Sequence, residues 1–411
     1  MATTISTGGD GPKPQLLSRV TGFKDKINAA HLLRKDDGLL TVCDDKSIRV
    51  LLARDNGQYW PSIHHMMPSL CLCLDFHEEA GRLFVGLENG TIAEFLLADD
   101  YNSLRPAKEF FSHTGGVTAL RWCLDWEWIL SVGKDKQIVW ECSETGRRLG
   151  SFPLDGWATC LEVDAGAKYA FVGDYTGSIS VLKLQENACE RVAKLAAHTG
   201  SIRSLAWDVE RSQLYSGSND SLIICWDIGG CQGKAIELTA HRRKVASVLY
   251  WPGRRALFSA GDDATLVVWD CSKPRKETPA WSSADNCERC DAPFFWNIRT
   301  MWERRTVGLR QHHCRLCGKA VCWTCSEGSL RYPPMGFEIP VRVCKDCQAR
   351  VEADNAASSS SAASQLTPMA SFHDLGQNVL GMDLDPVKGR LLTYGTDRVV
   401  KLWDVSEIMK P

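Results

Sequence analysis

The feature that most constrains this fold is a short apolar run that recurs along most of the chain. Seven such runs have a similar shape, and one residue in each occupies the same place. These residues are Leu51, Phe95, Trp140, Leu182, Trp226, Trp269 and Trp403. The first six are 42 to 45 residues apart, whereas the last step is 134. A period near 43 residues predicts a repeated unit of four short strands that buries its apolar faces against its neighbours.

Polar residues repeat with the same period. Asp220 lies six residues before Trp226, and His198 lies 28 before it. The related positions elsewhere are His113, His241, His373, Asp45, Asp263 and Asp397. Together with Trp-Asp at positions 226, 269 and 403, this pattern resembles the WD-repeat family. The resemblance implies a seven-bladed β-propeller and a hydrogen-bonded tetrad inside a blade, which in the fifth unit would be Asp220, His198, Ser216 and Trp226. We interpret the His–Asp pairs as structural, since each satisfies a buried polar group.

The long last step indicates an insertion. Removing one ordinary repeat from 134 leaves about 91 surplus residues. In WD-repeat topology a repeat begins with the outer strand of the preceding blade, so residues 369–374 should complete blade six. Residues 16–20 should likewise complete blade seven, which would remove a free sheet edge. The expected domains are a flexible N-terminus (1–14), six WD-type units (15–273), an inserted zinc finger (281–352), an Ala/Ser-rich tether (353–368) and the seventh unit (369–408).

The insertion carries four Cys-x-x-Cys pairs within 61 residues. They are Cys287/Cys290, Cys314/Cys317, Cys322/Cys325 and Cys344/Cys347. Eight thiolates make two tetrahedral Zn²⁺ sites. Because only four residues separate the second and third pairs, we expect an interleaved arrangement, with pairs one and three on one zinc and pairs two and four on the other. The finger has little aliphatic core, so folding should depend on the metal.

The same insertion is locally basic. Between Cys287 and Cys347 there are ten Lys and Arg against six Asp and Glu, in a chain whose net charge is −2. A solvated face with no ligand would have the same composition. The placement of five residues favours a ligand: Arg310, His312, His313 and Arg315 flank Cys314, and Arg342 precedes Cys344. If these side chains converge, a phosphate group is their natural partner, because Arg binds phosphate with two directional hydrogen bonds.

RQHHCRLCG, the eight cysteines, RVC at 342–344 and WSSAD at 281–285 resemble a FYVE zinc finger. That family binds phosphatidylinositol 3-phosphate on early endosomal membranes. The resemblance implies that Arg310, His312, His313, Arg315 and Arg342 line the headgroup pocket and that Asp285 accepts hydrogen bonds from ring hydroxyls. Two departures stand out. Gln311 replaces a basic residue, and the segment from Trp281 to Asp285 is one residue longer than the usual Trp-x-x-Asp.

A hydrophobic loop precedes the basic motif. Val307 and Leu309 flank Gly308, and in FYVE fingers this position is a tip that enters the bilayer. Two apolar residues in a loop can equally pack inside a protein. The segment 294–302 is longer than a minimal finger needs, and its aromatic residues Phe294, Phe295, Trp296 and Trp302 are expected either to pack on the propeller or to enlarge the membrane face.

Composition limits the function. The N-terminus has no secretory signal and no stretch is long and apolar enough to span a bilayer, so we expect a cytoplasmic peripheral protein. The chain is similar to small WD-repeat and FYVE-domain-containing proteins. This implies a non-enzymatic adaptor on early endosomes, with protein partners on the propeller, possible self-association and no nucleic-acid partner. The alternative is a RING-like ubiquitin ligase, since such zinc modules also recruit conjugating enzymes. That family normally has a Cys-x-His ligand arrangement, which this chain lacks.

Overall fold

The computed structural model describes residues 13–54, 57–229, 235–357 and 368–409. Residues 1–12 of the expected flexible N-terminus, and residues 358–367 of the expected tether, lie outside this range. The chain forms two compact units. The first contains Met1–Leu222, His241–Val268 and Phe372–Pro411, and the second contains Ile223–Ala240 and Trp269–Ser371.

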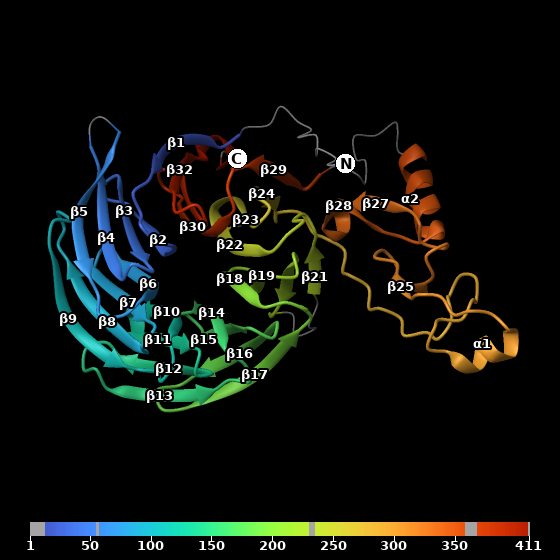
Figure 1. The fold of residues 1–411 in the computed structure, drawn as a ribbon, viewed down its shortest axis with the longest axis horizontal. Coiled ribbons are helices and arrows are strands. Elements are labelled where there is room, and N and C mark those ends of the chain that lie inside the picture. The colour runs from blue at the N-terminus through green and yellow to red at the C-terminus, as the bar shows by residue number, and fades with distance from the viewer. Residues whose placement is uncertain (1–12, 55–56, 230–234, 358–367, 410–411) are drawn as a thin grey trace. The chain divides into compact units, whose positions relative to one another are not determined.

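Seven four-stranded antiparallel sheets form the seven-bladed β-propeller (Figure 1). This confirms the predicted fold class. In sheet order the strands are β2 (Ile27–Leu33), β3 (Gly38–Cys43), β4 (Ser47–Ala53) and β5 (Tyr59–Met66); β6 (Cys71–His77), β7 (Arg82–Leu87), β8 (Thr91–Leu97) and β9 (Leu104–Phe111); β10 (Val117–Cys123), β11 (Trp128–Gly133), β12 (Gln137–Cys142) and β13 (Arg148–Pro153); β14 (Ala158–Asp164), β15 (Tyr169–Asp174), β16 (Ser178–Leu184) and β17 (Cys189–Ala196); β18 (Ile202–Asp208), β19 (Gln213–Ser218), β20 (Ile223–Asp227) and β21 (Ala235–Leu238); β22 (Val245–Trp251), β23 (Ala256–Gly261), β24 (Thr265–Asp270) and β29 (Ala370–Asp374); β30 (Val379–Asp385), β31 (Arg390–Gly395), β32 (Val400–Asp404) and β1 (Gln15–Val20).

The repeated apolar runs are the third strands of the sheets. The second strands are equally enclosed, and all six residues of β3, β11 and β23 are buried. Neighbouring blades cover both faces of these strands, so their sequences are nearly continuous apolar runs instead of alternating ones.

The first strands of the sheets form a closed ring. Each contacts the next in the order β2, β6, β10, β14, β18, β22 and β30, and β30 contacts β2 again. The N-terminal strand β1 pairs with β32 through Leu16 opposite Trp403 and Val20 opposite Val400. This is the pairing expected from the sequence, and it covers the free edge of β32.

Polar side chains on the first strands join neighbouring blades. Thr118 donates its hydroxyl hydrogen to the carbonyl of Ala158 at 2.8 Å, and Thr159 donates in the same way to Ile202 at 2.6 Å. These contacts hold β10, β14 and β18 in a fixed order around the axis. The hydroxyl hydrogens of Thr118 and Thr159 on the inner wall are therefore already donated within the protein.

The His–Asp pairs lie inside the blades. His198 contacts Asp220 through Nδ1 at 2.9 Å and Ser216 through Nε2 at 2.8 Å. His113 and His241 make the equivalent contacts with Asp135 and Ser131, and with Asp263 and Ser259. All three imidazole side chains are 0% exposed. These pairs are therefore structural, since no solvent or substrate reaches the rings.

The second unit contains the inserted finger. Its elements are α1 (Ile298–Arg304), β25 (His312–His313), β26 (Ala320–Val321), β27 (Ser329–Tyr332), β28 (Phe337–Arg342) and α2 (Lys345–Ala357). Helix α2 includes residues 353–357, which the sequence analysis had assigned to the flexible tether. That part of the prediction is wrong, because the alanines of this Ala/Ser-rich segment, Ala353, Ala356 and Ala357, are also strong helix formers. A third helix, α3 (Ser406–Met409), ends the described chain.

Candidate metal centre and phosphate-binding surface

Two clusters of four cysteines form inside the finger. Cys287, Cys290, Cys322 and Cys325 make one, and Cys314, Cys317, Cys344 and Cys347 make the other. In each cluster all four sulfur atoms lie within 4.8 Å of one another. The four sequence pairs are thus interleaved, with the first and third in one cluster and the second and fourth in the other.

The sulfur spacing fits zinc. A tetrahedron with Zn–S bonds of about 2.3 Å has sulfur atoms about 3.8 Å apart. The Cys290 and Cys322 sulfurs are 3.7 Å apart, and those of Cys317 and Cys344 are 3.9 Å apart. The eight cysteines could therefore hold two Zn²⁺ ions, which would supply no chemistry beyond cross-linking the finger.

Backbone N–H groups stabilise the thiolate form of Cys287, which is the form that binds a metal. Burial raises the pKa of Cys287, but N–H donors from Cys290, Cys322 and Arg289 outweigh it and lower the pKa to about 7. Burial and the neighbouring sulfurs raise the pKa of Cys290 to about 12. Four thiolates in one cluster repel each other and need a positive ion between them, which is the role of a structural metal.

The basic residues meet on one surface of the finger. His312 and His313 form β25, which pairs with β26. The N–H group of Arg315 donates to the carbonyl of Arg342 at 3.0 Å, so the two sequence motifs lie side by side. Burial lowers the pKa of His312, and the positive charges of Arg342, Arg310 and His313 lower it further. The charges of both motifs thus act on His312.

Aromatic side chains hold these cations in place. Trp281 stacks on His313 with ring centres 4.7 Å apart, and the Arg315 guanidinium lies 4.8 Å from the Trp281 ring. The Arg342 guanidinium lies 4.5 Å from the Trp323 ring and donates to the Ser326 carbonyl at 2.8 Å. The sequence analysis did not assign these roles to Trp281 and Trp323. Neither tryptophan adjoins a basic motif in the sequence, since Trp281 begins WSSAD and Trp323 lies between Cys322 and Cys325.

Three residues of the surface have other partners. Arg315 forms an ion pair with Glu237 of β21, with 3.1 Å between Nη1 and Oε2. His313 Nε2 lies 2.9 Å from the Ser282 carbonyl. Asp285 accepts a hydrogen bond from the Trp296 indole at 3.1 Å. Arg310 is exposed and has no ion-pair partner among the described residues. The structure thus brings the basic residues together, whereas the described contact of Asp285 is with the adjacent aromatic segment.

Exposed apolar side chains form a patch beside the basic surface. Phe294 is fully buried in the finger core, but Phe295, Ile298, Trp302 and Val307 are 59%, 70%, 86% and 86% exposed. The Phe295 N–H donates to the Leu309 carbonyl at 3.1 Å, so α1 and the loop at Val307 belong to one local structure. No helix within the described residues is long and apolar enough to cross a membrane.

Known proteins share both parts of this arrangement. A family model for the FYVE zinc finger matches residues 279–353, and one for the WD domain, G-beta repeat, matches residues 189–227 and 232–270. The chain is 49% identical over 397 residues to mouse "WD repeat and FYVE domain-containing protein 2", with 97% of each chain covered. It is 46% identical over 409 residues to bovine "WD repeat and FYVE domain-containing protein 1", covering 100% of this chain and 97% of the relative.

Comparison with solved structures supports the fold alone. The WD40 β-propeller domain of Doa1 aligns with a TM-score of 0.59 at 14% identity, covering 97% of this chain and 99% of that one. The repeats, the interleaved cysteine clusters and the full-length matches lead to one assignment. The chain belongs to the family of WD repeat and FYVE domain-containing proteins.

Proposed function

We propose that this protein is a peripheral adaptor that binds phosphatidylinositol 3-phosphate on early endosomal membranes from the cytoplasm. The observation that carries the proposal is that Arg310 and Arg342 act on His312, while the backbone of Arg315 is hydrogen-bonded to that of Arg342. Several guanidinium groups on one face favour a dianionic phosphate over a singly charged headgroup. The two Cys₄ clusters hold this face in shape, and the propeller is the surface for protein partners.

The exposed apolar patch supplies the second part of the membrane contact. Val307 and Leu309 of the loop, together with Ile298 and Trp302 of α1, are available to the bilayer interface. Arg299 and Arg304 of α1 form ion pairs with Glu303 and Asp291, and Arg305 directly follows the helix. A cation near an anionic leaflet contributes about 1 kcal/mol. Such a contact is reversible, so self-association of two copies would lengthen membrane residence by avidity.

In this proposal Asp285 keeps the role that its motif implies, which is to accept hydrogen bonds from the inositol ring hydroxyls. Its carboxylate accepts from Trp296 and so ties the motif to the aromatic segment next to α1. Reading of the inositol ring hydroxyls would require that carboxylate to accept additional hydrogen bonds. The oxygen that does not contact Trp296 is the one available for this.

Co-sedimentation with liposomes tests the proposal. The zinc-loaded chain should bind vesicles containing phosphatidylinositol 3-phosphate and should bind matched vesicles containing the 4-phosphate or the 3,4,5-trisphosphate more weakly. Arg315→Ala should lose the selective binding while keeping both zinc ions. Equal or absent binding would contradict the proposal, and a ubiquitin-transfer assay would then test the RING-like alternative.

A further inference from the structure

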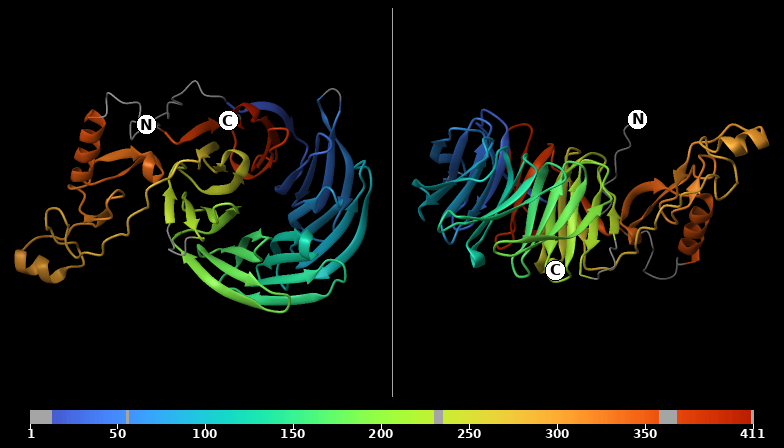
Figure 2. Two further views of the ribbon diagram at one scale, coloured as in Figure 1. Left: turned by 180° about the vertical axis from the view of Figure 1, so that it is seen from behind. Right: turned by 90° about the horizontal axis from the view of Figure 1, so that it is seen from below.

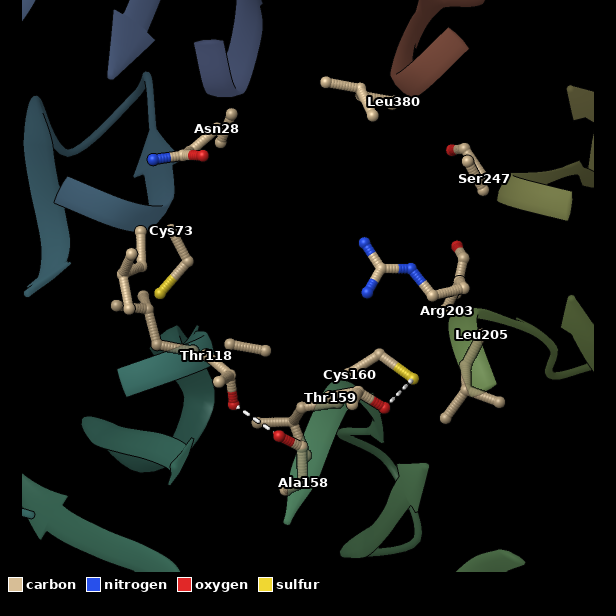
Figure 3. A pocket seen from close by; sticks show the side chains of 18 of the residues that line it. Asn28, Cys73, Thr118, Ala158, Thr159, Cys160, Arg203, Leu205, Ser247 and Leu380 are labelled. Carbon is tan, nitrogen blue, oxygen red and sulfur yellow. Dashed lines mark hydrogen bonds between the residues drawn. The ribbon is translucent and has the colours of Figure 1, made fainter. Parts of the chain in front are cut away.

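The centre of the propeller contains a cavity of about 490 Å³ that is independent of the finger. It is lined by the first strands of the blades and by loops at one end of them (Figure 3). Lys26, Arg121, Lys134 and Arg203 line it, and no Asp or Glu does. A cavity with cations and no carboxylates in its wall favours an anionic occupant.

Two of the four cations have acidic partners and two do not. Arg121 lies 3.4 Å from Glu162, and Lys134 lies 2.8 Å from Glu88. Among the described residues, Lys26 and Arg203 take part in no ion pair. Both are exposed, and Arg203 extends from β18 into the open space of the cavity (Figure 3). The guanidinium is therefore available to a ligand.

Trp157 and Tyr175 also line the cavity, and we call the end of the cavity at which they lie its mouth. Trp157 directly precedes β14 and Tyr175 directly follows β15, and the register pairs Ala158 with Asp174. Since strands run between the two faces of the ring (Figure 2), both aromatics lie at the same face. Their rings are 6.0 Å apart, and they are 53% and 63% exposed. Exposed aromatic residues beside a free Arg are typical of protein-binding hot spots.

Asp155 and Asp174 precede the aromatic pair in the sequence, and neither forms an ion pair with Arg203 or Lys26 among the described residues. Asp155 lies two residues before Trp157. Its carboxylate forms ion pairs with Arg191 at 3.1 Å and with Lys194 at 2.8 Å. Asp174 accepts hydrogen bonds from Thr176 and Ser178. These hydrogen bonds leave the negative charge of Asp174 in place, but Asp174 does not line the cavity, whereas Arg203 and Lys26 do.

We propose that this mouth binds an acidic segment of a protein partner, with one carboxylate side chain on Arg203 and the adjoining chain against Trp157 and Tyr175. The guanidinium lies within a cavity, which an extended side chain can enter and a flat bilayer cannot. The cavity volume suits one or two side chains, and the aromatic pair outside it can contact the rest of a peptide. This inference does not depend on lipid binding by the finger.

Panning a randomised peptide display library against the zinc-loaded full chain tests this proposal. The selected peptides should be enriched in Asp and Glu beside an apolar residue. The best of them, made synthetically, should bind Arg203→Gln about tenfold more weakly, as expected for the loss of a charge-assisted hydrogen bond. Trp157→Ala should also weaken binding, whereas the exposed outer-strand variants Arg105→Gln and Trp60→Ala should bind as the wild type does.

Three outcomes would overturn the proposal. One is selection without acidic enrichment, and another is unchanged binding of the selected peptide to Arg203→Gln. The third is a loss of liposome binding in Arg203→Gln equal to that in Arg315→Ala, because the mouth would then be a membrane contact. Thermal unfolding of Arg203→Gln and Arg105→Gln should coincide with that of the wild type, which separates lost binding from lost folding.

Discussion

The guanidinium of Arg315 lies 3.1 Å from the carboxylate of Glu237, a residue 78 positions earlier in the chain. Both side chains are less than a third exposed. A lipid phosphate that uses Arg315 must therefore compete with a carboxylate that is already in place. One cation of the proposed phosphate-binding surface thus already has an acidic partner within the protein.

Glu237→Gln should strengthen binding to vesicles containing phosphatidylinositol 3-phosphate. Removing the competing charge frees Arg315, and an ion pair of this exposure is worth about 1 kcal/mol or less, or up to about fivefold in affinity. Titration of vesicles by surface plasmon resonance measures the change. Glu109→Gln, on the exposed strand β9, is the matched control. A lower affinity of Glu237→Gln would show that the ion pair positions Arg315, and an unchanged affinity would show that it does not compete for Arg315.

Cys344→Ser should remove one zinc ion and abolish lipid binding. A three-cysteine site holds the metal poorly, and without it the strand that carries Arg342 has no fixed position. Zinc content by mass spectrometry and liposome co-sedimentation measure the two losses. Cys160→Ser, a buried cysteine of the propeller, should retain two zinc ions. Retention of both ions by Cys344→Ser would disprove its assignment as a ligand.

Trp302→Ala should shorten membrane residence without changing lipid selectivity. The side chain is 86% exposed in the free protein. Its transfer into the bilayer interface would contribute on the order of 1–3 kcal/mol, so we expect dissociation to be about tenfold faster. Stopped-flow dissociation from vesicles measures this rate. Trp60→Ala, on an outer strand and 58% exposed, is the control. Equal dissociation rates for the two variants would exclude α1 from the membrane contact.

Asp220→Asn should destabilise the propeller by about 1–3 kcal/mol, because a buried histidine loses a charged partner. Burial raises the pKa of Asp220, but the hydrogen bond and charge of His198 and N–H donors outweigh it, so the pKa is lowered. A lowered pKa contributes stability above the unfolded value of about 3.9 and loses it as the pH falls. Urea unfolding of wild type and variant should therefore converge below about pH 4. The control Asp125→Asn, in an exposed turn, should change neither the free energy of unfolding nor its dependence on pH. A pH-independent difference would contradict the charge argument.

The sequence was most informative where the signal was local or periodic. The 43-residue spacing identified the third strand of each blade, and the spacing of Cys314, Cys317, Cys322 and Cys325 was too tight for one ion, which predicted the interleaved clusters. Both arguments rest on chain geometry, and the chain had little room for another solution.

The tertiary contacts could not be predicted from the sequence. Nothing near Glu237 in sequence marks it as a partner of Arg315, and the described indole contact of Asp285 depends on how the segment after Cys290 folds back. The tether prediction failed at residues 353–357 because the composition that suggests a linker also suits the last turns of α2. Such outcomes depend on which surfaces meet, and the local sequence does not encode this.

The pairing of β1 with β32 has a consequence for the order of synthesis. The strand that seals the ring is translated before every other strand of the propeller, and its partner Val400–Asp404 is translated after all of them. The cysteines between them leave the ribosome earlier than the last blade does, so the finger can take up zinc while the propeller is still open. Until β32 is translated, β1 has no partner strand. A nascent chain that stalls after the finger therefore exposes both open ends of the unfinished ring.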